Sequence, residues 1–370
     1  MTSEDLFDSI ERYFDDALPF VSYRKPNTLE VKALFQNDDT IYNVSDFTES
    51  GFVFAPFDDS EKAVLIPIEA SEEFSVSVEV EDSKIEGASH SNQDGKDFYI
   101  KLVEKGVEVI KSERLSKVVL SRNETIEFPD LNFIQIFKRL LHTYPTAFVY
   151  CWYHPKIGLW LGATPETLLK VEGNRFSTMA LAGTQKYNGT LDVVWQDKEK
   201  NEQQIVTNYI ANSLKSSSNT LNISEVETVK AGNLLHLQTK IIGTSNSRFV
   251  NLQAILKALH PTPAVCGFPK DIAKQFILEN ENYNREYYAG FLGELNIKEK
   301  TNRNPKRRNV ENSAYGTVKT VSNLYVNLRC VQLKETKALI YVGGGITKNS
   351  NPESEWQETV NKSQTIKKVL

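Results

Sequence analysis

Hydrophobic positions along the chain recur with helical spacing in some stretches and form short apolar or alternating runs in others. The helical spacing predicts helices over residues 4–17, 97–112, 132–142, 198–214, 249–259, 269–283 and 352–368. The short runs predict strands within residues 28–80 and at 117–120, 147–153, 159–162, 168–171, 321–333 and 338–342. Many of these strands follow one another without a helix between them. This order predicts an α+β fold rather than a doubly wound one.

A polar stretch at residues 83–95 is the clearest internal break in the pattern. At 370 residues the chain has room for two or three domains or for one large domain. We predict a division into residues 1–96 and a core of residues 97–370. A basic run, Lys306-Arg307-Arg308, is interpreted as a solvated loop, with a nucleic-acid role as the alternative.

The composition predicts a cytoplasmic protein with a substantial core. Hydrophobic residues make up 40% of the chain, and the net charge of −5 gives no signal for a nucleic-acid or anionic-membrane partner. Cys151, Cys266 and Cys330 fall in apolar runs without metal-ligand spacing, as reduced buried thiols do. The acidic N-terminus lacks the apolar core of a signal peptide, and no apolar run reaches the 18 or more residues that a membrane helix needs.

A carboxylate pair stands near the C-terminus of the chain. In the helix predicted at 352–368, Glu355, Glu358 and Lys362 are spaced i, i+3 and i+7, so they share one face. Three glycines at 343–345 follow an apolar strand, and we interpret them as a cradle whose N–H groups approach a bound anion. The face predicts a site for a divalent cation and an anionic ligand. If this motif stood alone, a solvated C-terminal helix would be the better interpretation.

A second carboxylate pair occurs earlier, where Glu199 and Glu202 are spaced i, i+3 on the helix predicted at 198–214. We predict that Asp197 is the N-cap of this helix. Two helices that each offer spaced carboxylates, with no cysteine or histidine beside them, indicate a hard cation, and Mg²⁺ fits best. The alternative for this segment is an exposed helix rich in glutamate and lysine.

Taken together, the motifs resemble the chorismate-utilising enzymes, a family of isochorismate, salicylate, anthranilate and aminodeoxychorismate synthases. The motifs are the two carboxylate helices and residues 117–122, 162–166, 182–184, 260–269, 288–290 and 327–330. The resemblance spans residues 97–370. It implies one large chorismate-binding domain of mostly antiparallel sheets, with helices around a central cleft. Residues 1–96 would form the variable outer part of that fold.

The resemblance also implies roles for individual residues. Glu202 and Glu358 would bind Mg²⁺, with Glu199 and Glu355 supporting them directly or through water. The residues implied to bind chorismate are Gly183, Thr184, His236, Ala264, Arg329, Gly344, Gly345 and Lys362. A lone histidine in an apolar strand is usually structural, so that reading stays open for His236.

Three positions distinguish among the members of the family. Lys117 resembles the water-activating base of isochorismate and salicylate synthases, where anthranilate synthases have a neutral amide. Ala182 stands where aminodeoxychorismate synthases carry a nucleophilic lysine. The motif at 260–264 is closer to the isochorismate and salicylate pattern. We therefore predict an isochorismate synthase, with no amidotransferase subunit, that is a monomer or a weak homodimer. A salicylate synthase and a non-catalytic chorismate-binding protein are the alternatives.

The chemistry of this reaction requires a base and an acid. Lys117 as base has to be neutral when it activates water, and Glu166 as acid has to stay protonated near neutral pH, which an apolar pocket favours. Without the other motifs, Lys117 would be interpreted as a strand-edge lysine and Glu166 as a helix-start glutamate. Two departures from the family are Glu286, where many members have glycine, and a long basic loop at 298–312. Either could alter a lid or a contact between subunits.

Overall fold

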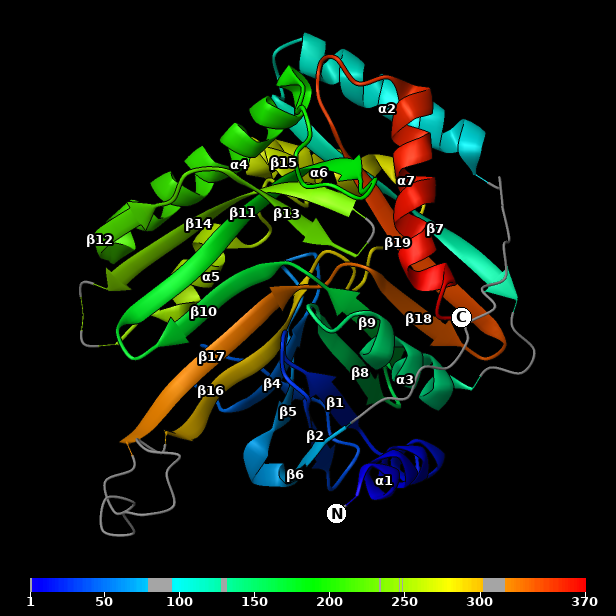
Figure 1. The fold of residues 1–370 in the computed structure, drawn as a ribbon, viewed down its shortest axis with the longest axis vertical. Helices are drawn as coiled ribbons and strands as arrows, with labels where there is room; N and C mark the ends of the chain where they lie inside the picture. Colours follow the sequence, from blue (N-terminus) through cyan, green and yellow to red (C-terminus); the bar gives the residue numbers. More distant parts are fainter. Residues whose placement is uncertain are drawn as a thin grey trace.

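The structure is a computed structural model that describes residues 2–78, 95–127, 132–232, 234–245, 247, 249–301 and 317–370. Two sheets of antiparallel strands dominate it, which confirms the predicted α+β class (Figure 1). The first sheet has the order β15 (Gly267–Phe268), β7 (Lys117–Glu127), β19 (Lys337–Ile346), β18 (Cys330–Lys334), β9 (Gly158–Thr164), β8 (Phe148–His154), β1 (Phe20–Arg24), β2 (Glu30–Gln36) and β6 (Ser71–Ser77).

The second sheet has the order β12 (Ser218–Ile223), β14 (Leu234–Ser245), β11 (Arg175–Lys186), β10 (Thr167–Glu172), β17 (Thr317–Val326), β16 (Phe291–Thr301), β4 (Gly51–Ala55), β5 (Val64–Pro67) and β3 (Tyr42–Asn43). A further strand, β13 (Glu227–Ala231), pairs with β14. Strands from the first 96 residues thus extend both sheets. Residues 83–94 of the predicted break and the basic run Lys306-Arg307-Arg308 lie outside the described residues.

Helices cover the sheets. They are α1 (Ser3–Asp15), α2 (Lys96–Lys111), α3 (Phe133–Thr143), α4 (Asp197–Leu214), α5 (Leu252–Leu259), α6 (Lys270–Asn280) and α7 (Pro352–Lys367). Figure 1 shows α4 along β11 and β14 of the second sheet, and α7 beside α2 across β19 of the first sheet. The two helices predicted to carry the carboxylates are thus mounted on different sheets. None of the helices in the described ranges combines the length and apolar character that a membrane span requires.

The larger of the two main hydrophobic cores contains side chains from both sheets. Phe148 of β8 stacks on Tyr325 of β17 with ring centroids 4.2 Å apart, and Phe54 of β4 lies 4.7 Å from Trp152 of β8. A second core forms where α1 and α3 pack on strands of the first sheet. All three cysteines are buried and free, as predicted.

The single strand predicted at residues 321–333 was wrong, and the difference changes the position of Arg329, a predicted site residue. The apolar run at 321–333 forms two strands, β17 in the second sheet and β18 in the first. The chain leaves the first of them at Asn327, which is fully buried, and Arg329 adopts a left-handed backbone with φ +50°. Such a conformation does not fit a strand. The crossover therefore carries Arg329 to the place where the chain passes from one sheet to the other.

Glu286 also has a left-handed backbone, with φ +49°, a conformation for which glycine is favoured. Its carboxylate accepts a hydrogen bond of 2.9 Å from Gln332 and lies 3.2 Å from the Lys334 ammonium. Both partners belong to β18, so Glu286 attaches its loop to the first sheet.

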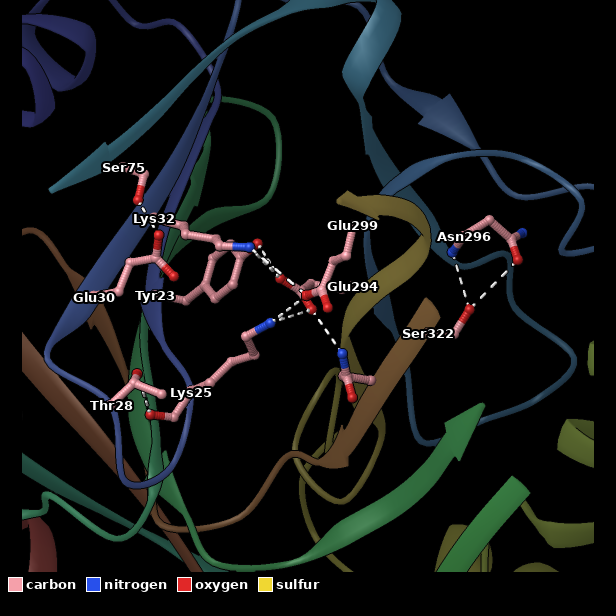
Figure 2. Close-up of polar contacts among 11 residues, drawn as sticks. Tyr23, Lys25, Thr28, Glu30, Lys32, Ser75, Glu294, Asn296, Glu299 and Ser322 are labelled. Carbon is pink, nitrogen blue, oxygen red and sulfur yellow. Dashed lines mark hydrogen bonds and ion pairs between the residues drawn. The ribbon is translucent and has the colours of Figure 1, made fainter. Parts of the chain in front are cut away.

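A buried ionic cluster joins the N-terminal strands to the second sheet (Figure 2). Glu294 of β16 is fully buried and accepts hydrogen bonds of 2.8 Å from Tyr23 of β1 and from Asn323 of β17. Lys25 and Lys32 lie 3.3 and 3.4 Å from its carboxylate oxygens. Burial opposes ionisation of Glu294, but these two lysines outweigh it and hold the pKa of Glu294 below its usual value. Paired charges thus add to the strand pairing that binds the first 96 residues to the rest of the molecule.

Candidate active site

A cavity is lined by residues from both sheets, from α4 and from α7. Together with its solvent-open mouth it encloses about 640 Å³ of empty space. Its lining includes nine of the predicted site residues, namely Glu166, Gly183, Thr184, Glu202, His236, Ala264, Arg329, Gly345 and Lys362. Motifs far apart in the sequence therefore meet at one place.

Lys117, the predicted base, is fully buried at the start of β7. Its Nζ lies 2.9 Å from Oε1 of Glu202, which reaches over from α4. The close approach depends on Gly345, because a Cβ there would lie 2.1 Å from that oxygen and 3.0 Å from Cε of Lys117. The glycine thus makes room for a lysine–glutamate pair.

The cradle of N–H groups expected at residues 343–345 stays a prediction. All three glycines lie inside β19 and pair on one side with β7, opposite Ser121, Leu120 and Val119. On the other side β18 pairs only with residues 337–340, and the lack of side chains at the glycines leaves space there. Gly345 lines the cavity, whereas Gly344 faces carboxylate oxygens of α7.

Glu166, the predicted acid, lies between β9 and β10 and is 4% exposed. Burial raises the pKa of Glu166 to about 8, although the charges of Lys117, Arg329 and Lys362 partly offset that rise. The carboxyl group is therefore mostly protonated at neutral pH, as its predicted role requires. It does not start a helix, so the alternative interpretation of this residue was wrong.

Two cations face the same cavity. In the described part of the chain, no group forms a hydrogen bond or ion pair with the guanidinium of Arg329, and burial lowers its pKa. Lys362 of α7 donates a 2.9 Å hydrogen bond to the carbonyl of Gly343 and lies 2.7 Å from Glu358. A half-buried guanidinium that no carboxylate pairs with among the described residues is a strong site for a carboxylate ligand.

His236 of β14 lies beside the backbone of Gly183, with Nδ1 2.8 Å from the Gly183 carbonyl oxygen. Burial, with a smaller contribution from Arg329, lowers the pKa of His236 to about 3, so the ring is neutral. Because a carbonyl only accepts, Nδ1 carries the proton, and Nε2 is left as a buried acceptor without a bonded partner among the described residues. His236 is thus able to accept a hydrogen bond from a ligand.

Two carboxylates of α7 lie close to Gly344. A Cβ on that glycine would lie 3.5 Å from Oε2 of Glu355 and 3.7 Å from Oε1 of Glu358. Burial raises the pKa of Glu355, and the charge of Glu358 adds to the rise. Burial also opposes ionisation of Glu358, but Lys362 and Lys198 outweigh it and lower the pKa of Glu358.

Lys198 is a site residue that the sequence interpretation missed. Its Nζ lies 2.5 Å from Glu355. Burial opposes the charge of Lys198, but Glu355, Glu358 and Glu202 outweigh it and raise the pKa of Lys198. Its position four residues before Glu202, on the same helical face, was the signal that could have identified it.

Glu199 turns towards the start of its own helix, where it accepts a 3.0 Å hydrogen bond from the backbone N–H of Gln196. Gln196, and not Asp197, is therefore the N-cap of α4. Within the ranges that the structure describes, no three or more histidine, cysteine or carboxylate side chains are grouped so that they could hold a metal as they stand. Each of Glu202, Glu355 and Glu358 instead has a lysine beside it.

The comparisons with known proteins identify the family. Two sequence models, both described as chorismate binding enzyme, match residues 53–302 and 305–368. The first of them covers more than half of the chain, so the chain belongs to the chorismate binding enzyme family. Its match begins inside the segment that we assigned to the variable N-terminal part.

Curated relatives include the isochorismate synthases EntC and MenF of Escherichia coli strain K12. EntC is 32% identical over 222 residues, which is 58% of this chain and 51% of EntC. MenF is 27% identical over 281 residues, which is 74% of this chain and 60% of MenF. The chain thus spans about half to three fifths of the length of these relatives.

Solved structures confirm the fold. The structure of E. coli MenF, described as menaquinone-specific, covers 95% of this chain and 88% of its own, with 21% identity and a TM-score of 0.74. DhbC from Bacillus anthracis, described as a 2,3-dihydroxybenzoate-specific isochorismate synthase, covers 97% and 98%, with 21% identity and a TM-score of 0.77.

The raised pKa of Glu166 predicts a measurable pH dependence of stability. A carboxyl group whose pKa rises on folding contributes stability below its unfolded value of about 4.3, and this contribution is lost as the pH rises through about 8. Glu166→Gln does not titrate, so it should gain stability relative to the wild type between about pH 5 and pH 9, by up to roughly 4 kcal/mol. Urea denaturation across this range measures it. If stability changed equally with pH in the variant and in the wild type, the raised pKa of Glu166 would be contradicted. Glu172→Gln, which removes an exposed carboxylate, is the control.

Proposed function

We propose that the protein is an isochorismate synthase that converts chorismate to isochorismate. The observation that carries the proposal is a protonated glutamate in the cavity wall, with a buried lysine close enough for its charge to act on that glutamate. Lys117 is fully buried, and Glu166 has a pKa of about 8. Arg329 and Lys362 supply positive charge at the same cavity for a substrate with two carboxylates. The relatedness to EntC and MenF supports the same activity.

The proposed chemistry uses these side chains in one balanced step. In the reactive state Lys117 is an amine rather than the ammonium that pairs with Glu202. This amine takes a proton from water as the water oxygen bonds to C2 of the ring, and the ring double bonds shift. The C4 hydroxyl departs with the proton of Glu166, so one water is consumed and one is released. Acid–base groups of this kind typically contribute about 10²–10⁴-fold in rate. The neutral ring of His236 and the Arg329 guanidinium would orient the substrate.

Magnesium is part of the proposal. The carboxylates of Glu202, Glu355 and Glu358 are oxygen donors of the type that Mg²⁺ prefers, and Glu355 keeps a buried oxygen without a bonded partner in the described part of the chain. All three charges act on the Lys198 ammonium, so the cluster already attracts a cation. Glu202 and Glu358 would hold the ion, with Glu355 and Glu199 in support. When bound, the ion supplies positive charge for a ring carboxylate of chorismate.

The alternative activities share the first step and diverge after isochorismate has formed. A salicylate synthase would use the same residues and then eliminate pyruvate. The product would feed menaquinone synthesis or a siderophore, and we favour menaquinone as the commoner use. The solved relatives include a menaquinone-specific and a 2,3-dihydroxybenzoate-specific enzyme of nearly equal similarity, so the pathway stays a prediction. A cytoplasmic location, a monomer or weak homodimer, and the lack of an amidotransferase subunit are proposed likewise.

A product assay tests the reaction class. Chorismate with Mg²⁺ should give isochorismate without release of pyruvate, measured by chromatography and a coupled pyruvate assay. With ammonium added, no aminated product is expected, because Ala182 is not a nucleophile. Anthranilate or aminodeoxychorismate formed at a rate near that of isochorismate would overturn the proposal, and stoichiometric pyruvate would favour the salicylate synthase.

Variants separate the two acid–base groups from the anion site. Lys117→Ala and Glu166→Gln should each lower kcat by about 10²–10⁴-fold with little change in KM, because neither is proposed to hold a carboxylate. Arg329→Ala should instead raise KM, through loss of a charge-assisted contact. Steady-state kinetics with chorismate distinguishes the two patterns. A near-normal kcat for Lys117→Ala would place the base elsewhere.

A further inference from the structure

Strand β7 carries Lys117. Along one of its two edges, a neighbouring strand pairs with only a short part of it. On its other side, β19 pairs with every residue from Val118 to Glu127, whereas β15 pairs only with Lys117 and Val118. Beyond that point, the N–H of Val119 donates to the carbonyl of Cys266 at 2.8 Å. The carbonyl of Val119 and the N–H of Ser121 still need partners on this side.

Two side chains that the proposed mechanism does not use supply those partners. Arg285 donates a 2.7 Å hydrogen bond to the Val119 carbonyl, and Glu281 accepts one of 2.7 Å from the Ser121 N–H. The two side chains also form an ion pair of 2.5 Å, with both side chains 2% exposed. An arginine and a glutamate thus continue the ladder where β15 ends.

Arg285 also reaches a second wall of the cavity. Its other terminal nitrogen donates a 3.0 Å hydrogen bond to the carbonyl of Val265. Val119 and Val265 both line the cavity, and so does Ala264. One planar guanidinium therefore fixes the spacing between β7 and the segment that carries Ala264 and Val265, which a point-like ammonium could not do at both carbonyls.

We propose that Arg285, held in place by Glu281, is a positioning residue that sets where Lys117 stands relative to the opposite cavity wall. This inference rests on the proposed function. Val119 and Lys117 are two residues apart on one strand, so their side chains point to the same face, and a displaced Val119 carbonyl moves Lys117. Arg329 and Lys362 lie on other elements and keep their places. Loss of the Arg285 contacts should therefore lower kcat and leave KM largely unchanged.

The test is Arg285→Lys, which keeps a charge for Glu281 but loses the double contact. We expect kcat for chorismate to fall by about 10–100-fold, with KM changing less than about threefold. In a Lys117→Ala background the same substitution should cost less than about twofold, because the group that it positions is already gone. Glu281→Gln, which keeps an acceptor for Ser121 but loses the ion pair, should give a smaller loss of the same kind.

Arg24→Lys is the matched control. Arg24 is also buried and donates to two backbone carbonyls, those of Leu141 and Tyr144, but neither of these residues lines the cavity. The Arg24→Lys substitution should lower thermal stability, as Arg285→Lys does, but should change kcat less than about twofold. Equal kcat losses in the two variants, or an undiminished loss for Arg285→Lys in the Lys117→Ala background, would overturn the inference.

Hydrogen exchange of the backbone amides separates this inference from the proposed function. In Arg285→Lys the amides of Val119 and Ser121 should exchange faster than in the wild type, whereas in Arg24→Lys they should not. Unchanged exchange at both amides overturns the positioning role. Faster exchange in Arg285→Lys, together with a wild type that never converts chorismate, would support the contact and refute the isochorismate synthase activity instead.

Discussion

The rest of the site depends on the pairing of charges that are buried or partly buried. Three glutamates from two helices meet three lysines, in the pairs Glu202 with Lys117, Glu355 with Lys198, and Glu358 with Lys362. Lys117 and Glu355 are the buried members, and because a buried ion without a counter-charge costs several kcal/mol, each is held where its partner is. The pairing holds three carboxylates beside a cavity that also contains Arg329, a cation with no ion-pair partner among the described residues.

The two-sheet architecture makes this pairing possible. Helix α4 packs on the second sheet and α7 on the first, so the carboxylates approach from different layers. The glycines of β19 let the side chains come close, because a Cβ at Gly345 would overlap Glu202. The crossover at Asn327 brings Arg329 to the same cavity. Glu166 forms no ion pair with any of the described residues, and its burial keeps it mostly protonated at neutral pH.

The periodic parts of the sequence predicted the fold class and the main helices, and the contacts between distant segments could not be predicted. The spacing of Glu355, Glu358 and Lys362 placed these side chains on one face of a helix, because helical periodicity is a local property. The strand at 321–333 was wrong, since the left-handed Arg329 that divides it is set by tertiary packing. Lys198 was missed because a lysine on a polar helix resembles a solvated one until its three carboxylate neighbours are known.

The side chains that bond to the backbone of β7 could not be predicted from the sequence either. Arg285 and Glu281 are spaced like any i, i+4 surface pair, and only the fold shows that both are buried against the edge of a strand. Glu294 and its lysines are a similar case at the junction of the two sheets. In each case the charge itself was visible in the sequence, but its burial was not.

Turnover of chorismate after treatment with EDTA, and again after addition of Mg²⁺, tests the role of the paired carboxylates most directly. The wild type should lose activity in the chelator and recover it with Mg²⁺. Glu358→Gln should stay inactive under both conditions while its circular dichroism remains that of the folded protein, and Glu294→Gln, whose carboxylate lies outside the cavity, should recover as the wild type does. Full turnover in the chelator would contradict the claim that these carboxylates form a cation-dependent site.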